Sequence, residues 1–197
     1  DKQLPFDAEW DEIDITSNSK VIEMCKEYSI DIVVVGPEKQ FEQGLTNALK
    51  EKNVLIFGPS REASQLETSK SFTKTMCKYK NIPTANYEIF SRSDDAREFL
   101  KVQPKPYVIK ADGLAAGKGV LVSKNIKEAK EWVDSVMNNS LFGVAGENIL
   151  IEECLYGTEL SFMGIMTPCE FVPFETSVDY KPLFNGNKGP NLSLIHI

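Results

Sequence analysis

The sequence predicts an α/β protein, and three observations lead to that prediction. Short runs of β-branched and other apolar residues recur along the chain, such as Ile32–Val35, and two of them stop at Gly-Pro. Segments with apolar residues at helical spacing alternate with these runs. The 197 residues, 42% of them hydrophobic, are enough to bury a core. Strands and helices that alternate in this way form βαβ units of a doubly wound sheet.

The first part of the chain predicts one such unit. After an acidic, aperiodic opening, Thr16–Ser19 offers N-cap side chains to an amphipathic helix that reaches Tyr28. Residues 31–36 and 54–57 predict strands buried on both faces, as in a parallel sheet. A helix over 41–52, with an apolar stripe, is expected between them.

Caps, chain breakers and alternation predict the later elements. Two helical stretches are expected over 61–67 and 69–80, the second capped by Ser69 and ended by Pro83. A change of domain is expected within 66–84. Strands are then expected over 85–90, 107–110, 120–123, 148–153, 159–166 and 170–174, and helices over 94–101 and 127–137.

Composition excludes several classes of function. The formal net charge of −7 argues against broad capture of nucleic acid and leaves room for a local basic pocket. The only histidine is His196, so a Ser-His-Asp triad or a multi-histidine metal site has no support. The four cysteines form no C-x-x-C pair and predict reduced, mostly buried thiols in a cytoplasmic protein. No apolar run approaches the ~20 residues that span a bilayer.

Residues 108–122 carry the most informative motif, in which three glycines and Lys118 connect two apolar strands. Glycine lets backbone N–H groups turn toward an anion, and Lys110 and Lys118 can neutralise a polyphosphate. The pattern differs from G-x-x-x-x-G-K-[ST], because Gly119 follows the lysine and a strand comes next. It predicts a lid-like hairpin over phosphates. The alternative is an ordinary solvated hairpin, for which Lys118→Ala leaves nucleotide affinity unchanged.

Residues 149–159 hold a second group of polar residues. An apolar strand ends in Glu152 and Glu153, and a glycine turn then leads to Glu159. Carboxylates at a strand end can accept hydrogen bonds from ribose hydroxyls, and a hinge backbone can pair with an adenine edge. Taken alone, these glutamates are better explained as a solvated face.

Several segments together resemble the phosphoribosylamine–glycine ligases, a family of the ATP-grasp superfamily. The resemblance runs from about Asp14 to Asn191. It implies a partial Rossmann-like N-terminal domain over 1–66 and the first part of an ATP-grasp domain over 67–197, with 84–153 as its small lid subdomain. The segments are Val35–Glu38, Gly58–Ser60, Gln65–Lys74, Ile82–Ala85, Ile109–Val120, Ile151–Phe162 and Gly189–Asn191.

The resemblance also implies a role for individual residues. Lys110 and Lys118 are the implied catalytic residues, and no metal ligand is assigned within the chain. The implied ATP-binding residues are Lys70, Lys110, Gly113, Gly117, Lys118, Gly119, Glu152, Glu153, Leu155 and Glu159. The implied substrate-binding residues are Gly36, Pro37, Glu38, Asp179, Lys181 and Asn191.

The implied activity is ATP-dependent ligation of glycine to 5-phosphoribosylamine through a glycyl phosphate, in de novo purine biosynthesis. ATP and Mg²⁺ are the implied cofactors. A cytoplasmic monomer with these two small-molecule substrates, and with no nucleic-acid or membrane partner, is expected. The alternatives are another ATP-grasp carboxylate–amine ligase and a nucleotide-binding module without turnover.

The chain also departs from the family's pattern. From the resemblance, we expect the family's first strand and glycine-rich phosphoribosyl-phosphate loop, and the half of its ATP-grasp domain that carries the metal ligands, to lie outside this sequence. Residues 192–197 look foreign to the family, and Asn187 stands where the family usually has aspartate. We therefore expect this polypeptide alone to show no ligase activity.

Overall fold

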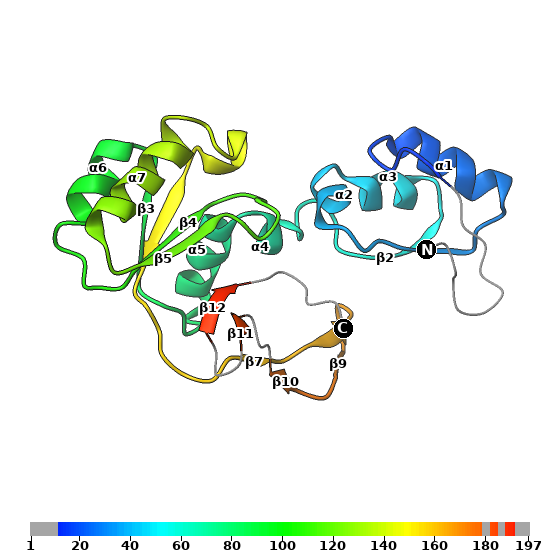
Figure 1. The fold of residues 1–197 in the computed structure, drawn as a ribbon. Coiled ribbons are helices and arrows are strands. Elements are labelled where there is room, and N and C mark those ends of the chain that lie inside the picture. Colours follow the sequence, from blue (N-terminus) through cyan, green and yellow to red (C-terminus); the bar gives the residue numbers. More distant parts are fainter. Residues whose placement is uncertain (1–11, 179–181, 185–187, 192–197) are drawn as a thin grey trace. The chain divides into compact units, whose positions relative to one another are not determined.

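The computed structural model describes residues 12–178, 182–184 and 188–191, and it confirms the α/β class (Figure 1). The chain divides into two compact units, one ending at Glu152 and the other beginning at Glu153. In the described part of the chain, no helix is both long and apolar enough to cross a bilayer.

The N-terminal part of the first unit contains a small two-stranded sheet. Strands β1 (Ile32–Val34) and β2 (Leu55–Phe57) pair in parallel. Helices α1 (Asn18–Glu27) and α3 (Leu45–Glu51) cover one face of this sheet (Figure 1). Their buried residues, Val21, Cys25, Leu45 and Leu49, pack with Val33, Val35, Val54 and Ile56.

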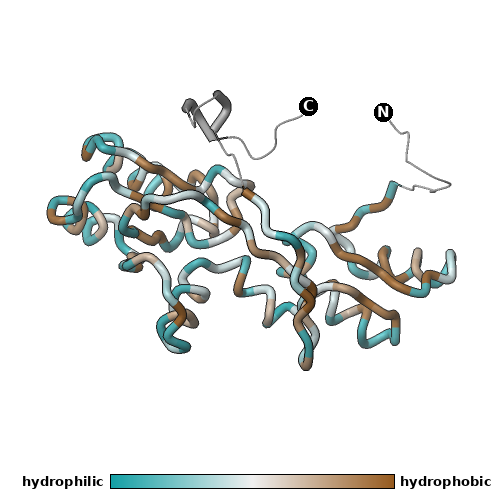
Figure 2. Tube along the Cα trace, turned by 90° about the horizontal axis from the view of Figure 1, so that it is seen from below, coloured by the Kyte–Doolittle hydropathy of each residue, from teal (hydrophilic) through white to brown (hydrophobic). Residues whose placement is uncertain are grey.

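The prediction that these two strands are buried on both faces is wrong. Alternate residues point away from the helices, and Val34 and Leu55 are each 68% exposed. Figure 2 shows the hydrophobic colouring along both strands. Within the described residues, helices pack on one face of this sheet only, so the apolar run does not correspond to two-sided burial.

The predicted helix over 41–52 is also corrected, because two helices occupy this region. Helix α2 (Glu38–Glu42) ends before Gly44, and α3 starts at Leu45. Gly44 has φ of +78°, in the left-handed region that glycine adopts without steric cost. A continuous helix cannot pass through that conformation.

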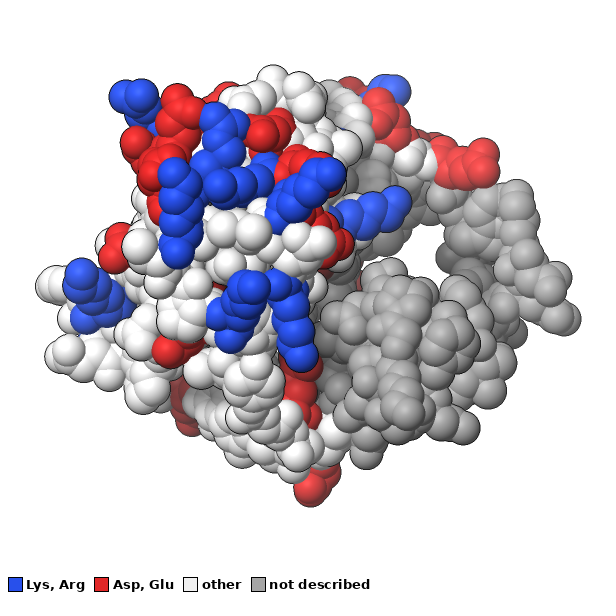
Figure 3. Space-filling view, turned by 60° about the vertical axis from the view of Figure 1, so that its left-hand side comes forward, with Lys and Arg blue, Asp and Glu red and all other residues white. Residues whose placement is uncertain are grey.

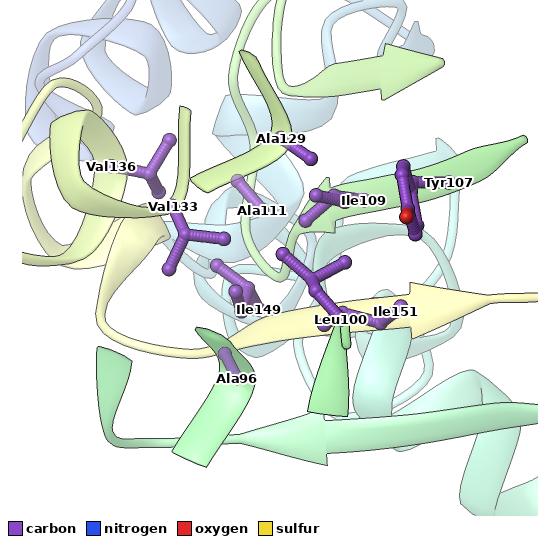
Figure 4. Close-up of a cluster of buried hydrophobic side chains, with 10 residues drawn as sticks. All are labelled: Ala96, Leu100, Tyr107, Ile109, Ala111, Ala129, Val133, Val136, Ile149 and Ile151. Carbon is purple, nitrogen blue, oxygen red and sulfur yellow. The ribbon is translucent and has the colours of Figure 1, made fainter. Parts of the chain in front are cut away.

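A four-stranded antiparallel sheet forms the larger part of the first unit, in the order β3-β6-β4-β5. Helices α6 (Ser93–Phe99) and α7 (Ile126–Met137) pack on it. Figure 4 shows the resulting core, in which Ile109 and Ile149 from the sheet face Val133 from α7. The strands are β3 (Tyr87–Phe90), β4 (Tyr107–Ala111), β5 (Val120–Ser123) and β6 (Ile149–Glu152).

Helix α5 (Lys70–Lys80) begins where the sequence predicts. The Ser69 hydroxyl caps it by accepting a hydrogen bond from the backbone N–H of Phe72 at 3.2 Å. The stretch before it is less helical than expected, because α4 covers only Gln65–Thr68 and residues 61–64 form turns. A short 3₁₀ helix, η1 (Gly143–Gly146), precedes β6.

The second unit consists of short antiparallel strand pairs. The predicted strand over 159–166 is split into β7 (Leu160–Ser161) and β8 (Gly164–Met166). Each half finds its own partner, β10 (Ser177–Val178) and β9 (Phe171–Pro173) respectively. Strands β11 (Pro182–Phe184) and β12 (Lys188–Asn191) form a further pair.

Acidic and basic side chains intermingle on the face shown in Figure 3. Among the described residues, Arg97 pairs with Asp94 and Asp134, and Lys101 pairs with Glu98. The four cysteines are free thiols. Only Cys25 is fully buried and Cys169 is exposed, so the expectation of mostly buried thiols is wrong.

Candidate functional site

A cavity of about 790 Å³ in the first unit brings together residues far apart in sequence. This volume lies within the range of small-molecule sites. Lysines from α5 and β4 face it together with the connection between β4 and β5 and the last residue of β6. Its lining includes Pro37, Glu38, Glu67, Lys70, Thr73, Lys74, Thr84, Lys110, Gly113, Leu114, Ala115, Ala116, Gly117, Gly119, Val120 and Glu152.

The glycine-rich turn, residues 112–119, lies between β4 and β5. Ala116 and Gly117 have φ of +47° and +75°, so the tip turns through two consecutive left-handed residues. The N–H of Lys118 closes the tip on the carbonyl of Ala115 at 2.9 Å. The Lys118 side chain is exposed at this tip and is not part of the cavity lining found among the described residues.

Gly113 fixes the base of the turn. Its N–H donates to the carbonyl of Ala145 at 3.0 Å, so this donor is already used inside the fold. A Cβ at position 113 would lie 2.8 Å from both Cα and Cβ of Ala145. Glycine is therefore required here by the close approach of two backbone segments.

We expect Gly113→Ala to destabilise the chain by about 1–3 kcal/mol, because the added methyl forces the turn away from η1. Urea unfolding monitored by circular dichroism measures this. Gly157→Ala is the control, since a Cβ there meets no atom within 4 Å, and its stability should stay within about 0.5 kcal/mol of the wild type. Equal midpoints for the two variants would contradict the packing role of Gly113.

Lys70, the first residue of α5, reaches the base of the glycine-rich turn. Its Nζ donates to the carbonyls of Asp112 at 3.2 Å and Gly113 at 3.1 Å. Burial lowers the pKa of the Lys70 ammonium from its ordinary value, the Asp112 carboxylate opposes this shift, and Lys110 adds to it. Lys70 thus brings positive charge into the cavity wall beside the turn.

Asp112 ties the turn to the start of α5. Its carboxylate accepts a hydrogen bond from the backbone N–H of Ser71 at 2.7 Å and bonds from the hydroxyls of Ser69 and Ser71. A carboxylate at a helix N-terminus meets unpaired N–H groups and the positive end of the helix dipole. The base of the turn is therefore anchored 41 residues away in sequence, while its tip has no such tie among the described contacts.

Glu152 lies at the end of β6 and is only 3% exposed. Its Oε2 accepts a hydrogen bond from Lys110 Nζ at 2.8 Å and lies 3.3 Å from Lys74 Nζ. Its Oε1 is buried and has no hydrogen-bond partner in the described structure. The interpretation of this glutamate as part of a solvated face is therefore wrong, because β6 is the inner neighbour of both β3 and β4.

Two residues of the site were missed from the sequence, Lys74 and Asp112. Lys74 follows Lys70 by four residues, which places both on one face of a helix, and this spacing was the available signal. Asp112 lies inside the glycine-rich motif, but its bonds to Ser69 and Ser71 depend on tertiary contacts.

The structure brings together most of the ATP-binding residues expected in the first unit. Glu153, Leu155 and Glu159 belong to the second unit, where Glu153 is half-buried and the other two are exposed. Pro37 and Glu38 line the cavity, whereas Gly36 is exposed outside its lining. Asp179 and Lys181 lie outside the described residues, and only the backbone of Asn191, in β12, is described.

The part of the chain that contains this sheet and most of the cavity lining matches an ATP-grasp domain, so the chain is an ATP-grasp protein. Phosphoribosylamine–glycine ligase from Thermotoga maritima superposes with a TM-score of 0.72 at 34% identity, over 84% of this chain and 41% of that one. N5-carboxyaminoimidazole ribonucleotide synthetase superposes with a TM-score of 0.65, and its 15% identity shows the fold alone.

The chain belongs to the phosphoribosylglycinamide synthetase family. The ATP-grasp (A) domain of that family matches residues 68–193, and its N domain matches residues 5–67. Phosphoribosylamine–glycine ligases of Arabidopsis thaliana (chloroplastic) and Clostridium acetobutylicum are 44% and 42% identical, each over 91% of this chain. The chain spans 34% and 43% of the length of these two relatives.

Proposed function

We propose that this chain forms part of an ATP-dependent carbon–nitrogen ligase that joins glycine to 5-phosphoribosylamine. The products are glycinamide ribonucleotide, ADP and phosphate, in de novo purine biosynthesis. One observation carries the proposal: Lys70, Lys110, Glu152 and the glycine-rich turn line a single cavity. The similarity to phosphoribosylamine–glycine ligases over 91% of the chain supports this choice of substrates.

The cavity suits a nucleoside triphosphate in two respects. Lys70 and Lys110 supply ammonium groups for phosphate oxygens, which favour charge-assisted hydrogen bonds. Glu152, whose Oε2 accepts a hydrogen bond from Lys110 Nζ at 2.8 Å, fixes one of these ammonium groups at the cavity wall. We assign Gly117, Lys118 and Gly119 to a flap over the phosphates, with Lys110 and Lys118 as the catalytic lysines.

The proposed reaction needs little proton transfer in its first step. The glycine carboxylate is already ionised at pH 7, and one of its oxygens attacks the γ-phosphorus of ATP as the bond to ADP breaks. The amine of phosphoribosylamine then attacks the glycyl carbonyl, and phosphate leaves. The chain's lysines align the phosphates and balance their charge, and the flap keeps water from the acyl phosphate.

Mg²⁺ supplies charge neutralisation to phosphoryl transfer in ATP-dependent ligases. In the part of the chain that the structure describes, no three His, Cys, Asp or Glu side chains are grouped to hold a metal ion. We assign no step to the metal. We propose that its ligands lie in parts of the ligase other than these residues.

The remaining residues are assigned by the same proposal. Glu153 and Leu155 form the adenine hinge, and Glu159 binds the ribose. Residues 1–66 form the N-terminal domain, residues 67–197 belong to the ATP-grasp domain with 84–153 as its lid, and the ligase is a cytoplasmic monomer. The substrate contacts are assigned to Gly36, Pro37, Glu38, Asp179, Lys181 and Asn191.

We expect a full-length ligase containing these residues to release ADP only when glycine and phosphoribosylamine are both present. A coupled assay for ADP, run with each substrate omitted in turn, measures this. ADP release with a different carboxylate or amine, and none with this pair, would identify another ATP-grasp ligase. ATP binding without turnover under any of these conditions would identify a non-catalytic module.

A further inference from the structure

Among the lysines that line the cavity, Lys74 is the most buried. It lies four residues after Lys70 on α5 and is 9% exposed. Its Nζ donates to Thr84 Oγ1 at 2.7 Å and to the carbonyl of Ala85 at 3.3 Å, and it lies 3.3 Å from Glu152 Oε2. An ammonium group has three donors, so two of them are used within the fold, and the Glu152 carboxylate lies beside the ammonium as its counter-ion.

Lys110 contacts the same carboxylate oxygen as Lys74, but its side chain is more exposed and makes fewer contacts with the fold. Its side chain is 28% exposed, compared with 11% for Lys74. Among the described contacts it uses one donor, on Glu152 Oε2 at 2.8 Å. Two donors are therefore left to meet a ligand in the cavity. Lys74 therefore bonds mainly to the fold, whereas Lys110 has donors available to a ligand in the cavity.

The orientation of the Glu152 carboxylate depends on these two lysines. Oε1 has no partner in the described structure, so every described contact of the carboxylate runs through Oε2. Lys74 is held by Thr84 and Ala85, and it is the fixed member of the pair. Without Lys74 the carboxylate can rotate about its last bond and take Lys110 with it.

We propose that Lys74 is a positioning residue, which fixes the Glu152 carboxylate so that this carboxylate holds Lys110 at the phosphate end of the cavity. This inference rests on the proposed function, because it assigns Lys110 to the phosphates of ATP. Lys74 acts through Glu152 and touches no phosphate itself. Its contribution is to align the positive charge of Lys110.

Calorimetric titration of this chain with ATP tests the effect on binding. Lys74→Met should weaken ATP binding about tenfold or more, since a misaligned ammonium forfeits a charge-assisted hydrogen bond. Lys74→Arg keeps the charge and should recover part of the affinity. Lys78→Met, an exposed lysine one turn further along α5, is the matched control and should bind as the wild type does.

A second measurement does not depend on ATP. Lysine side-chain ¹H–¹⁵N spectra of the unliganded chain report on ammonium groups that are paired and protected from exchange. We expect Lys74→Met to shift or broaden the Lys110 signal and Lys78→Met to leave it in place. If Lys74→Met does not fold, the pair of variants Glu152→Gln and Lys74→Met/Glu152→Gln tests the route without an unbalanced buried carboxylate: because Lys74 acts through this carboxylate, adding Lys74→Met to Glu152→Gln should not change the Lys110 signal further.

The outcomes separate this inference from the proposed function. A Lys74→Met chain that binds ATP as tightly as the wild type and keeps its Lys110 signal overturns the positioning role, and the proposed function stands. A wild-type chain that takes up no ATP removes the support for an ATP site, and the Lys110 signal still decides the role of Lys74. Loss of thermal stability alone, with affinity and signal unchanged, shows a purely structural lysine.

Discussion

Lys110→Ala should reduce ADP formation by a full-length ligase about 10²–10³-fold. Preorganised charge at a reacting phosphate has effects of this size when one donor is removed. Lys110 is the lysine of β4 that lines the cavity and has donors to spare, and its position is set by the 2.8 Å bond to Glu152. Steady-state rates of ADP release at saturating glycine and phosphoribosylamine measure the loss.

The matched control for this variant is Lys124→Ala, an exposed lysine just after β5. It removes one positive charge from the same hairpin and should leave the rate within about twofold, because exposed charges are screened by solvent and salt. A Lys110→Ala enzyme that folds and keeps more than about a third of the wild-type rate would contradict the assignment of this lysine.

The fold was predictable where local chemistry and tertiary structure agree. Ser69 is a good N-cap, and α5 begins after it; the glycine-rich motif between two apolar runs is the β4–β5 hairpin. The predictions are wrong where a single residue, or the number of layers packed on a strand, determines the structure. Gly44 breaks a helix whose apolar stripe continues through it. The β1 run has the composition of a two-sided strand, but composition does not record how many layers cover it.

The site was predictable as a set of residue types and less so as a set of contacts. The resemblance supplied Lys70, Lys110 and Glu152, and all three line the cavity. The sequence did not show that Glu152 is buried between two cations, because that depends on β6 being an inner strand of the sheet. Lys74 was overlooked for a similar reason, since its acceptors, Thr84 and Ala85, lie 10 and 11 residues further along the chain and meet it only in the folded structure.

Glu152→Leu should destabilise the chain by about 3–5 kcal/mol, which is the range for removing one partner from a buried ion pair. Glu152 Oε2 is the counter-ion of both Lys74 and Lys110, and Lys74 has little access to water. Leucine matches the size of the glutamate and leaves two ammonium groups close together without a carboxylate. The free energy of unfolding in urea measures this effect.

Glu131→Leu is the control, because Glu131 forms an exposed ion pair with Lys127 on α7. Such pairs contribute about 0–1 kcal/mol, so this variant should unfold within about 0.5 kcal/mol of the wild type. If Glu152→Leu is equally well tolerated, the carboxylate is not needed to balance the lysines. If Glu152→Leu unfolds more easily than Glu131→Leu, a well-packed apolar residue cannot replace the buried Glu152 carboxylate unless both lysines are replaced as well. A buried carboxylate of this kind is expected where a lysine must keep its charge at the edge of a binding cavity.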